Sequence, residues 1–169
     1  MLFRSNWGYA GTSDSQIPDG QATFEAGLET FLSTMAGSNL NHDVGYLDFG
    51  RTGSLEMIII QDECIDQIRR LYRGIPVSEE MLAVDVVREV GSQGDFLSHP
   101  HSLKHLRNTQ WRPTLSNRLG YEEWETSGST SLLERARHKL KSILQEHGAR
   151  PIPPNQAGEI QKRVDQFKT

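Results

Sequence analysis

The order in which two kinds of hydrophobic pattern follow one another constrains this chain most. Strand-like segments occur only before Gly53, and helical patterns occupy nearly everything after it. Two short candidate strands, Leu2–Asn6 and Asn39–Asp43, are each followed by a loop rich in Gly, Ser and Asp and then by a segment of helical period. Strand, loop and helix thus occur twice in that order, which is the unit of a parallel α/β protein. We therefore expect the two strands to be parallel neighbours, with only helices after them.

Two helices belong to these units. The first is expected over Asp19–Met35, with Asp19 as its cap and a single apolar face formed by Phe24, Leu28, Phe31, Leu32 and Met35. The second is expected to begin at the cap Ser54 and to end at Gly74, and Asp62 is a candidate point for a break in it. The loops between strand and helix, 8–19 and 46–53, are predicted to have no regular structure.

The remaining residues carry only helical signals. Ser78 is placed to cap a helix that Gly91 closes, and Pro100 suits the first turn of a short helix. Trp111 and Pro113 indicate a connector that also contains Tyr121 and Trp124. Ser131 and Glu134 form a capping-box pattern before the next helix, and Ile160, Val164 and Phe167 mark a weaker last one.

Two strand–helix units are too few for an independent domain of this class. A parallel sheet needs cover on both faces, and a complete (β/α)8 barrel has about 250 residues. We therefore interpret residues 1–75 as the last two βα units of a TIM barrel and residues 76–169 as a C-terminal helical extension of the same domain. Such a fragment should expose the sides of its strands and the apolar faces of its first two helices, so we expect a homo-oligomer.

Composition excludes several classes of function. The net charge of −4 gives no basic footprint for nucleic acid, and no apolar run approaches the ~20 residues of a membrane span. The single cysteine, Cys64, cannot form an internal disulfide, and the start of the chain has no signal-peptide pattern, so we expect a cytoplasmic protein.

His101 and His105 share a helix face, but they lack the partners of a zinc motif, so solvated or helix-packing histidines are favoured and no metal site is predicted.

Four segments carry a resemblance to a known family. They are SDSQIPDGQATFE at 13–25, AGSNLNHDVGYLDFGRTGSLE at 36–56, LAVDVVREVGSQGDFLSHPHSLKHLR at 82–107 with WRPTLSNR at 111–118, and YEEWETSGSTSLLERARHKLKSIL at 121–144. In order and without large gaps, these segments resemble the C-terminal portion of the trimethylamine methyltransferase family.

The resemblance implies a TIM-barrel enzyme that moves a methyl group from a methylated amine to the cobalt of a cognate corrinoid protein. The chain itself would bind no cofactor, because the partner protein carries the corrinoid. Some members contain pyrrolysine, whose position would fall in or near the loop Gly11–Pro18, and only standard residues occur there. That favours the pyrrolysine-free branch, whose substrates include quaternary amines such as glycine betaine. The alternative is a truncated, inactive copy that serves as a docking or oligomerisation module, and the isolated fragment is expected to be inactive in either case.

Given the family, the site should hold a cation with aromatic faces and carboxylates on loops at the C-terminal ends of the strands. No Ser/His/Asp or Cys/His pattern for nucleophilic catalysis is found, and demethylation of a quaternary ammonium needs no proton donor. His42 is the candidate catalytic residue, and a histidine merely hydrogen-bonded in the barrel mouth is the alternative. The candidate substrate-binding residues are Tyr9, Asp14, Asn41, Tyr46 and Asp48. Asp14 and Asp48 could instead cap turns, and Tyr9 and Tyr46 could be packing residues.

Overall fold

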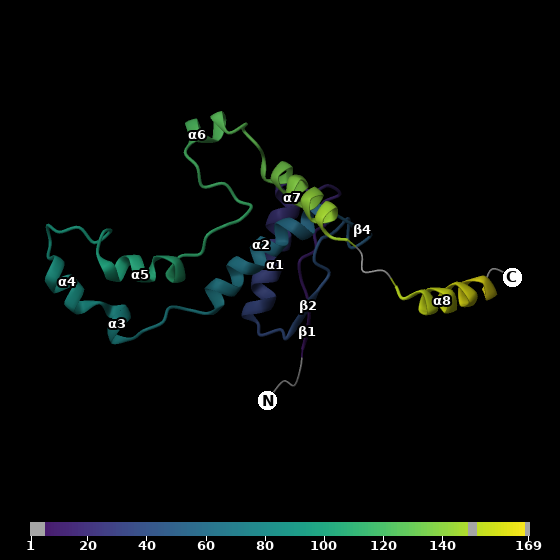
Figure 1. Ribbon diagram of the computed structural model, residues 1–169, viewed down its shortest axis with the longest axis horizontal. Helices are drawn as coiled ribbons and strands as arrows, with labels where there is room; N and C mark the ends of the chain where they lie inside the picture. Colours follow the sequence, from purple (N-terminus) through teal and green to yellow (C-terminus); the bar gives the residue numbers. More distant parts are fainter. Residues whose placement is uncertain (1–5, 149–151, 168–169) are drawn as a thin grey trace.

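A computed structural model describes residues 6–148 and 152–167 of the chain. The protein is mixed α/β, with its few strands near the beginning and helices throughout the rest (Figure 1). In chain order, the elements are β1 (Trp7–Tyr9), α1 (Gly20–Met35), β2 (Leu40–His42), β3 (Tyr46–Leu47), β4 (Thr52–Gly53), α2 (Leu55–Tyr72), α3 (Glu79–Leu82), α4 (Val84–Val90), α5 (Pro100–Thr109), α6 (Tyr121–Thr126), α7 (Leu132–Glu146) and α8 (Pro154–Gln166). None of the helices in the described ranges is long and apolar enough to cross a membrane.

The strands β1 and β2 are parallel neighbours, as predicted. Trp7 pairs with Leu40 and Tyr9 pairs with His42. Regular pairing in the first strand lies later than the predicted Leu2–Asn6, of which residues 2–5 lie outside the described ranges. Asn6 only begins the contact, since its carbonyl accepts hydrogen bonds from the N–H groups of Asn39 and Leu40. No strand follows Gly53 in residues 54–148 or 152–167, as predicted, but the expectation that only helices follow the two parallel strands was wrong, because β3 and β4 come between β2 and α2.

The segment predicted as an irregular loop, 46–53, instead folds into a small antiparallel hairpin. Tyr46 pairs with Gly53 and Leu47 with Thr52, so that β3 and β4 each have two residues. Three residues between them, Asp48, Phe49 and Gly50, have φ values of 50°, 56° and 78°. A strand pair this short has no alternating pattern to read in the sequence, because the period needs at least four residues to appear.

α1 packs against α2 through small residues. Asp19 caps α1, since its carboxylate accepts a hydrogen bond from the Ala22 N–H at 2.9 Å. The buried face of α1 consists of Ala22, Ala26 and Thr30, and a Cβ at Gly27 would lie 3.3 Å from Cys64 Sγ on α2. Small side chains let the two backbones approach closely. The larger residues of α1 lie on other sides and are exposed: Phe24, Leu28, Leu32 and Met35.

α2 packs against both α1 and α7. Ser54 caps it by accepting a hydrogen bond from Met57 N at 3.2 Å, as predicted. The suggested break near Asp62 was wrong: the helix is continuous from Leu55 to Tyr72. Its sequence contains no Gly or Pro to interrupt it, and Asp62 points to solvent, 4.0 Å from Lys139 Nζ on α7.

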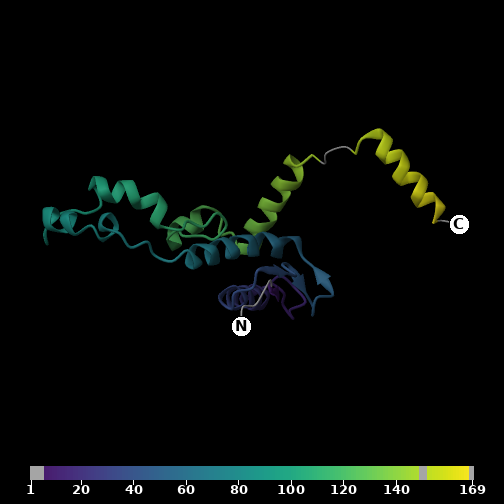
Figure 2. The ribbon, with the colours of Figure 1, turned by 90° about the horizontal axis from the view of Figure 1, so that it is seen from below.

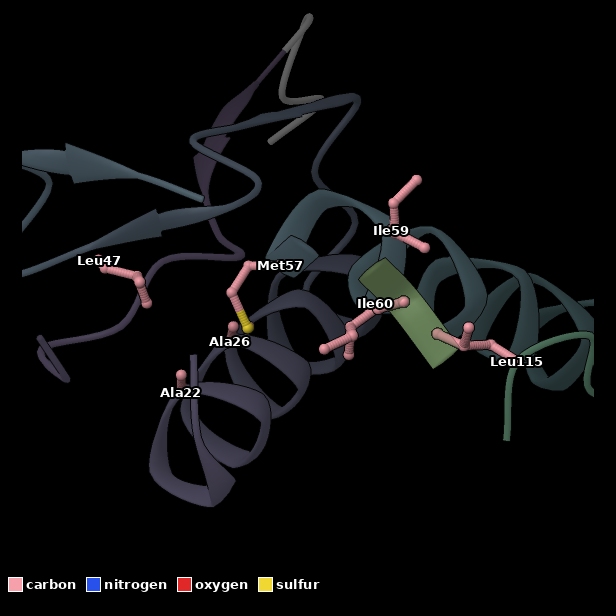
Figure 3. Close-up of a cluster of buried hydrophobic side chains, with 8 residues drawn as sticks. Ala22, Ala26, Leu47, Met57, Ile59, Ile60 and Leu115 are labelled. Carbon is pink, nitrogen blue, oxygen red and sulfur yellow. The ribbon is translucent and has the colours of Figure 1, made fainter. Parts of the chain in front are cut away.

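The hydrophobic core forms where α1, α2, β3 and α7 meet. Figure 3 shows Met57 of α2 reaching toward Ala26 of α1, with Ile60 and Leu115 on another side of α2. The burial of the Cys64 thiol raises its pKa, which fits the predicted structural role. The core consists of Ala22, Ala26, Leu47, Met57, Ile59, Ile60, Leu115 and Ala136.

Much of the remaining apolar surface is exposed. Trp7, Tyr9 and Leu40 on the strands and Leu71 and Tyr72 on α2 are all exposed, as are the large residues of α1. The arm formed by α3, α4 and α5 and the isolated helix α8 contain no buried residue, and they extend in opposite directions from the core (Figures 1 and 2). The exposure of strands and first helices confirms what the sequence led us to expect.

The helical extension differs from the prediction in two places. The helix capped by Ser78 is divided into α3 and α4 by Ala83, which has φ 51° and thus interrupts the helical hydrogen bonds. Tyr121 and Trp124, predicted to lie in a connector, form the short helix α6. The capping box of Ser131 and Glu134 at the start of α7 is confirmed by both reciprocal hydrogen bonds.

One buried carboxylate fastens the extension to α2. Glu63 accepts hydrogen bonds from the N–H groups of Thr114 at 2.6 Å, Ser116 at 2.7 Å and Leu115, and from the hydroxyls of Thr114 and Ser116. Burial alone would raise the pKa of Glu63, but these hydrogen bonds from Ser116, Leu115 and Thr114 outweigh it and lower the pKa below its ordinary value. The ionised form is therefore the one that the fold stabilises.

We predict that Glu63→Gln destabilises the protein by about 2 kcal/mol, since hydrogen bonds to a charged group are worth about 1.5–3 kcal/mol each and an amide nitrogen cannot accept them. The pKa of Glu63 is lower in the folded state, so its contribution is complete above the ordinary value of 4.5 and is lost as the pH falls below it. Urea unfolding at one protein concentration, between pH 7 and about pH 3, measures both effects. Glu122→Gln on the exposed surface of α6 is the control, and an equal loss in the two variants, or a pH-independent difference, would contradict the prediction.

We also predict that the 169-residue chain produced alone self-associates or binds a hydrophobic dye, because its strands and first two helices expose large apolar side chains. Light scattering and dye fluorescence test this directly. A monomer with a sharp cooperative melt and no dye binding would show that these side chains need no partner.

Candidate functional site

The C-terminal ends of β1 and β2 bring three ring side chains together. Successive side chains alternate between the two faces of a strand, so Trp7 and Tyr9 share a face with Leu40 and His42, their partners in the register. The rings of Trp7 and His42 have centroids 5.4 Å apart, and the Tyr9 ring meets the His42 ring edge-on at 5.7 Å. We call Trp7, Tyr9 and His42 the ring cluster.

The ring cluster is open to solvent. Trp7 is 70% exposed and Tyr9 is 55% exposed, and α1 lies on the opposite side of the two strands. Aromatic rings of this size are usually covered in a protein, so the exposed faces are available to a ligand or to another part of the protein. The Tyr9 hydroxyl extends toward the hairpin turn, 3.9 Å from where a Cβ at Gly50 would lie.

Asp43 holds the imidazole of His42. Its carboxylate Oδ2 lies 2.8 Å from His42 Nδ1, and both side chains are partly exposed. Asp43 has φ 73°, a left-handed conformation that Asp tolerates better than most residues, and this turn brings the carboxylate back over the preceding side chain. A carboxylate on Nδ1 fixes the orientation of the ring and leaves Nε2 available to a ligand.

The structure does not bring Asn41 to this cluster. Its Oδ1 accepts a hydrogen bond of 2.6 Å from Ser33 Oγ of α1, on the helix-covered face of β2. Gly8 of β1 leaves the room that this contact needs, because a Cβ there would lie 2.3 Å from both Asn41 Oδ1 and Ser33 Oγ. Asn41 therefore ties the strands to α1. Adjacent residues of a strand point to opposite faces, so the sequence already indicated that Asn41 and His42 do not share a face.

Of the other three candidates, Asp14 lies in the first loop, Tyr46 begins β3 and Asp48 follows β3. Asp48, with φ 50°, occupies the hairpin turn; its N–H donates to Ser15 O at 2.9 Å and its carbonyl accepts from Arg51 N at 3.0 Å, which agrees with the turn alternative. The carbonyl of Tyr46 accepts a hydrogen bond from Ser13 N at 3.0 Å, while its side chain is exposed. Asp14 is exposed, and its N–H donates to Glu25 Oε2 at 3.0 Å.

Two acidic residues of α1 position the first loop and were missed by the sequence reasoning. Glu25 accepts a hydrogen bond from Ser13 Oγ at 2.6 Å, and Glu29 accepts one from Thr12 N at 3.3 Å. Burial raises the pKa of Glu29, which the Thr12 hydrogen bond only partly opposes. Their spacing of four residues, on the side of the helix next to the preceding loop, is the signal that could have identified them.

Gln61 was also missed. It is only 2% exposed, and neither of its amide atoms has a partner within the described residues. Its Oε1 would lie 2.7 Å from a Cβ at Gly11, so the side chain reaches directly under the first loop. A polar residue directly after the apolar run at 57–60, one helical turn beyond the buried Met57, was the sequence signal for it.

The histidines of α5 make contacts of helix packing. His101 Nε2 lies 2.7 Å from the carbonyl oxygen of Glu80, and His105 Nε2 lies 3.1 Å from the Glu80 carboxylate. His99 caps α5 by accepting a hydrogen bond from His101 N at 3.1 Å. Across residues 6–148 and 152–167, no three His, Cys, Asp or Glu side chains gather as metal ligands would. These contacts agree with the interpretation that these histidines hold α5 against α3.

Comparisons with known proteins point to one family. The model of the trimethylamine methyltransferase family matches residues 4–169. The chain is 35% identical over 161 residues to a trimethylamine methyltransferase of Desulfitobacterium hafniense, covering 95% of this chain and 32% of that protein. It is 36% identical over 140 residues to a trimethylamine methyltransferase of Methanosarcina thermophila, covering 83% of this chain and 29% of that protein.

The chain is also similar to a relative whose name gives a different substrate. The glycine betaine methyltransferase of Desulfitobacterium hafniense is 28% identical over 158 residues, covering 93% of this chain and 32% of that protein. The chain thus spans about a third of the length of the curated relatives that it matches.

The contact of Gly8 with Asn41 gives a test of which way Asn41 points. We predict that Gly8→Ala destabilises the protein by about 1–3 kcal/mol, the usual cost of an overpacked site. Asn41→Ala should remove the clash with Asn41 Oδ1, while those with Ser33 Oγ and Ser38 Oγ remain, so that the double variant is less destabilised than the sum of the two single changes. Gly20→Ala, where the new Cβ meets nothing within 4 Å, is the control and should be neutral or slightly stabilising. If the losses in free energy of unfolding of the two single variants, measured in urea, add up to that of the double variant, Asn41 faces away from Gly8.

Proposed function

The chain belongs to the trimethylamine methyltransferase family, and on that premise we propose that it supplies part of the active site of an enzyme that methylates the cobalt of a cognate corrinoid protein. The family match over residues 4–169 is the observation that carries this proposal. The methyl donor would be a small methylated amine, either trimethylamine or a quaternary amine such as glycine betaine.

The architecture proposed for this enzyme is a TIM barrel, to which β1–α1 and β2–α2 would contribute the last two βα units. The parallel pairing of β1 and β2, with α1 on one face, supports this arrangement. The other face, which carries Trp7, Leu40 and the rest of the ring cluster, would then point into the barrel. Active sites of such barrels lie at the C-terminal ends of the strands, where Tyr9 and His42 lie.

The ring cluster suits an alkylated ammonium ion. The faces of Trp7 and Tyr9 can each attract a cation by about 0.5–2 kcal/mol, and more strongly where water is excluded. The nitrogen of a quaternary amine leaves as a neutral amine, so no residue need donate a proton to it. The task of these side chains is then to hold the cation in one orientation and to keep water away from the methyl group that is transferred.

In this proposal, His42 positions the substrate. Asp43 fixes its ring at 2.8 Å, and Trp7 and Tyr9 contact the ring on two sides, so the imidazole is held rigidly at the end of β2. Asp14, Tyr46 and Asp48 would contact the donor from the surrounding loops, while Asn41 would act by holding β2 against α1. The reduced cobalt of the partner's corrinoid is the methyl acceptor, and none of these residues needs to ligate it.

Glycine betaine is the first choice of donor. The loop Gly11–Pro18 contains only standard residues, and one relative is named a glycine betaine methyltransferase. The alternative function, a docking or oligomerisation module without turnover, is favoured by the apolar side chains exposed on β1, β2 and α1. The chain by itself is expected to have no activity, because in the proposed barrel it supplies two of eight strands.

We predict that His42→Ala lowers the rate of cobalt methylation at least ~100-fold, since misplacing a bound reactant by about 1 Å can cost that much. The assay uses the longest protein in which this segment occurs, a reduced corrinoid protein and glycine betaine, and follows the corrinoid spectrum. His101→Ala is the matched control and should remain within a few-fold of the parent, because His101 contacts Glu80 and not the ring cluster.

Two results would count against the proposal. If His42→Ala is as active as the parent while His101→Ala is inactive, the site lies elsewhere. If trimethylamine is used and every quaternary amine is refused, the choice of glycine betaine is wrong, although the methyl transfer itself would stand.

A further inference from the structure

Four arginines line a single cleft at the C-terminal end of α2. This end of the helix is remote from the ring cluster. The cleft has a volume of about 660 Å³, and its walls include Arg70 and Arg73 from the end of α2, Arg107 from α5, and Arg112 from the connector, with Asp66 and Trp111 beside them. The protein as a whole has a net charge of −4, so this concentration of positive charge is local.

In the part of the chain that the structure describes, none of these arginines forms an ion pair with a carboxylate. Asp66, the one acidic residue of the cleft, accepts a hydrogen bond of 2.7 Å from Trp111 Nε1. Elsewhere arginines do find acidic partners: Arg88 lies 3.0 Å from Asp85, and Arg137 lies 3.3 Å from Glu56. Within the described ranges, no ion pair involves an arginine of the cleft.

The four arginines have different roles. Arg70 builds the cleft, since it donates hydrogen bonds to Gly74 O at 3.0 Å and Thr109 O at 2.8 Å and so joins α2 to the end of α5. Arg73, Arg107 and Arg112 make no side-chain hydrogen bond in the part of the chain that the structure describes. Three guanidinium groups are therefore available to a ligand.

The favourable interaction of a positive charge with a helix C-terminus explains the position of only some of the four arginines. Arg70 and Arg107 lie in the last turns of α2 and α5, where a positive charge stabilises a helix. Arg112 lies in the connector, outside any helix, and gains nothing from such an interaction. Its presence in the same cleft needs another explanation.

We propose that this cleft binds a small ligand that carries two or more oxyanion groups, phosphates or carboxylates. Guanidinium groups bind such oxygens through paired, charge-assisted hydrogen bonds. The volume lies within the range of about 300–1,000 Å³ that is usual for small-molecule sites, and the concave shape suits a small ligand better than a flat protein surface. Three free positive charges match a ligand of two or three negative charges, and Trp111 offers it an apolar wall.

The site is separate from the proposed methyl-transfer site. Ser54, which caps the start of α2, donates its N–H to Gly45 O in the loop that follows β2, so the ring cluster lies near the start of this helix. The arginine cleft lies at its other end, about 25 Å away for a helix of 18 residues rising about 1.5 Å per residue. A ligand there would not touch the substrate cation.

Calorimetric titration with tripolyphosphate and with citrate tests this inference on the protein at low ionic strength. We expect at least one of them to bind, and the stronger of the two identifies phosphate or carboxylate as the preferred group. Arg107→Gln and Arg112→Gln should each weaken binding about 10-fold, because each removes charge-assisted hydrogen bonds. Arg69→Gln is the matched control: Arg69 is exposed on α2, next to Arg70, and does not line the cleft, so binding should change less than about 2-fold.

Three results would overturn the inference. One is the absence of binding of either probe at millimolar concentration. Another is an equal loss for Arg69→Gln and Arg112→Gln, which would reduce the effect to general charge attraction. The third is binding of a hexaglutamate peptide while both small anions fail, which would make the cleft part of a surface for an acidic protein.

Discussion

The close packing of α1 on α2 is the contact on which the other features of this protein depend. Ala22, Ala26 and Gly27 let the two helices approach until Met57 of α2 packs against Ala26 of α1 (Figure 3). α1 in turn fixes the strands, through Ser33 and Asn41, and the first loop, through Glu25 and Glu29. Larger side chains on this face of α1 would separate the helices and move the strand ends.

α2 connects the two halves of the chain by polar contacts as well as by apolar ones. Glu63 accepts the N–H groups of three consecutive residues of the connector, and Arg135 of α7 donates to the carbonyl of Leu115 at 2.7 Å. Glu63 and Leu115 are buried, so leaving either of them unmatched costs more than the hydrogen bond itself contributes. The connector therefore has a defined path although it contains little regular structure.

The two sites that we propose, one near each end of α2, would take ligands of opposite charge. Near its start, the rings of Trp7, Tyr9 and His42 and the carboxylate of Asp43 suit a cation. Near its end, arginines without acidic partners suit an anion. Both preferences come from side chains that the core leaves at the surface, and neither requires the helix to move.

The sequence by itself determined the features that depend on neighbours a few residues apart. These include the order of strands and helices, the caps at Asp19 and Ser54, and the capping box at Ser131, because each forms within one turn of a helix. Only the tertiary structure decided that Asn41 faces α1, that 46–53 forms a hairpin, and that Glu63 binds residues 114–116. Glu63 and its partners lie about fifty positions apart, a separation that is closed by packing and that no local pattern encodes, while the strands of the hairpin are too short to show a period in the sequence.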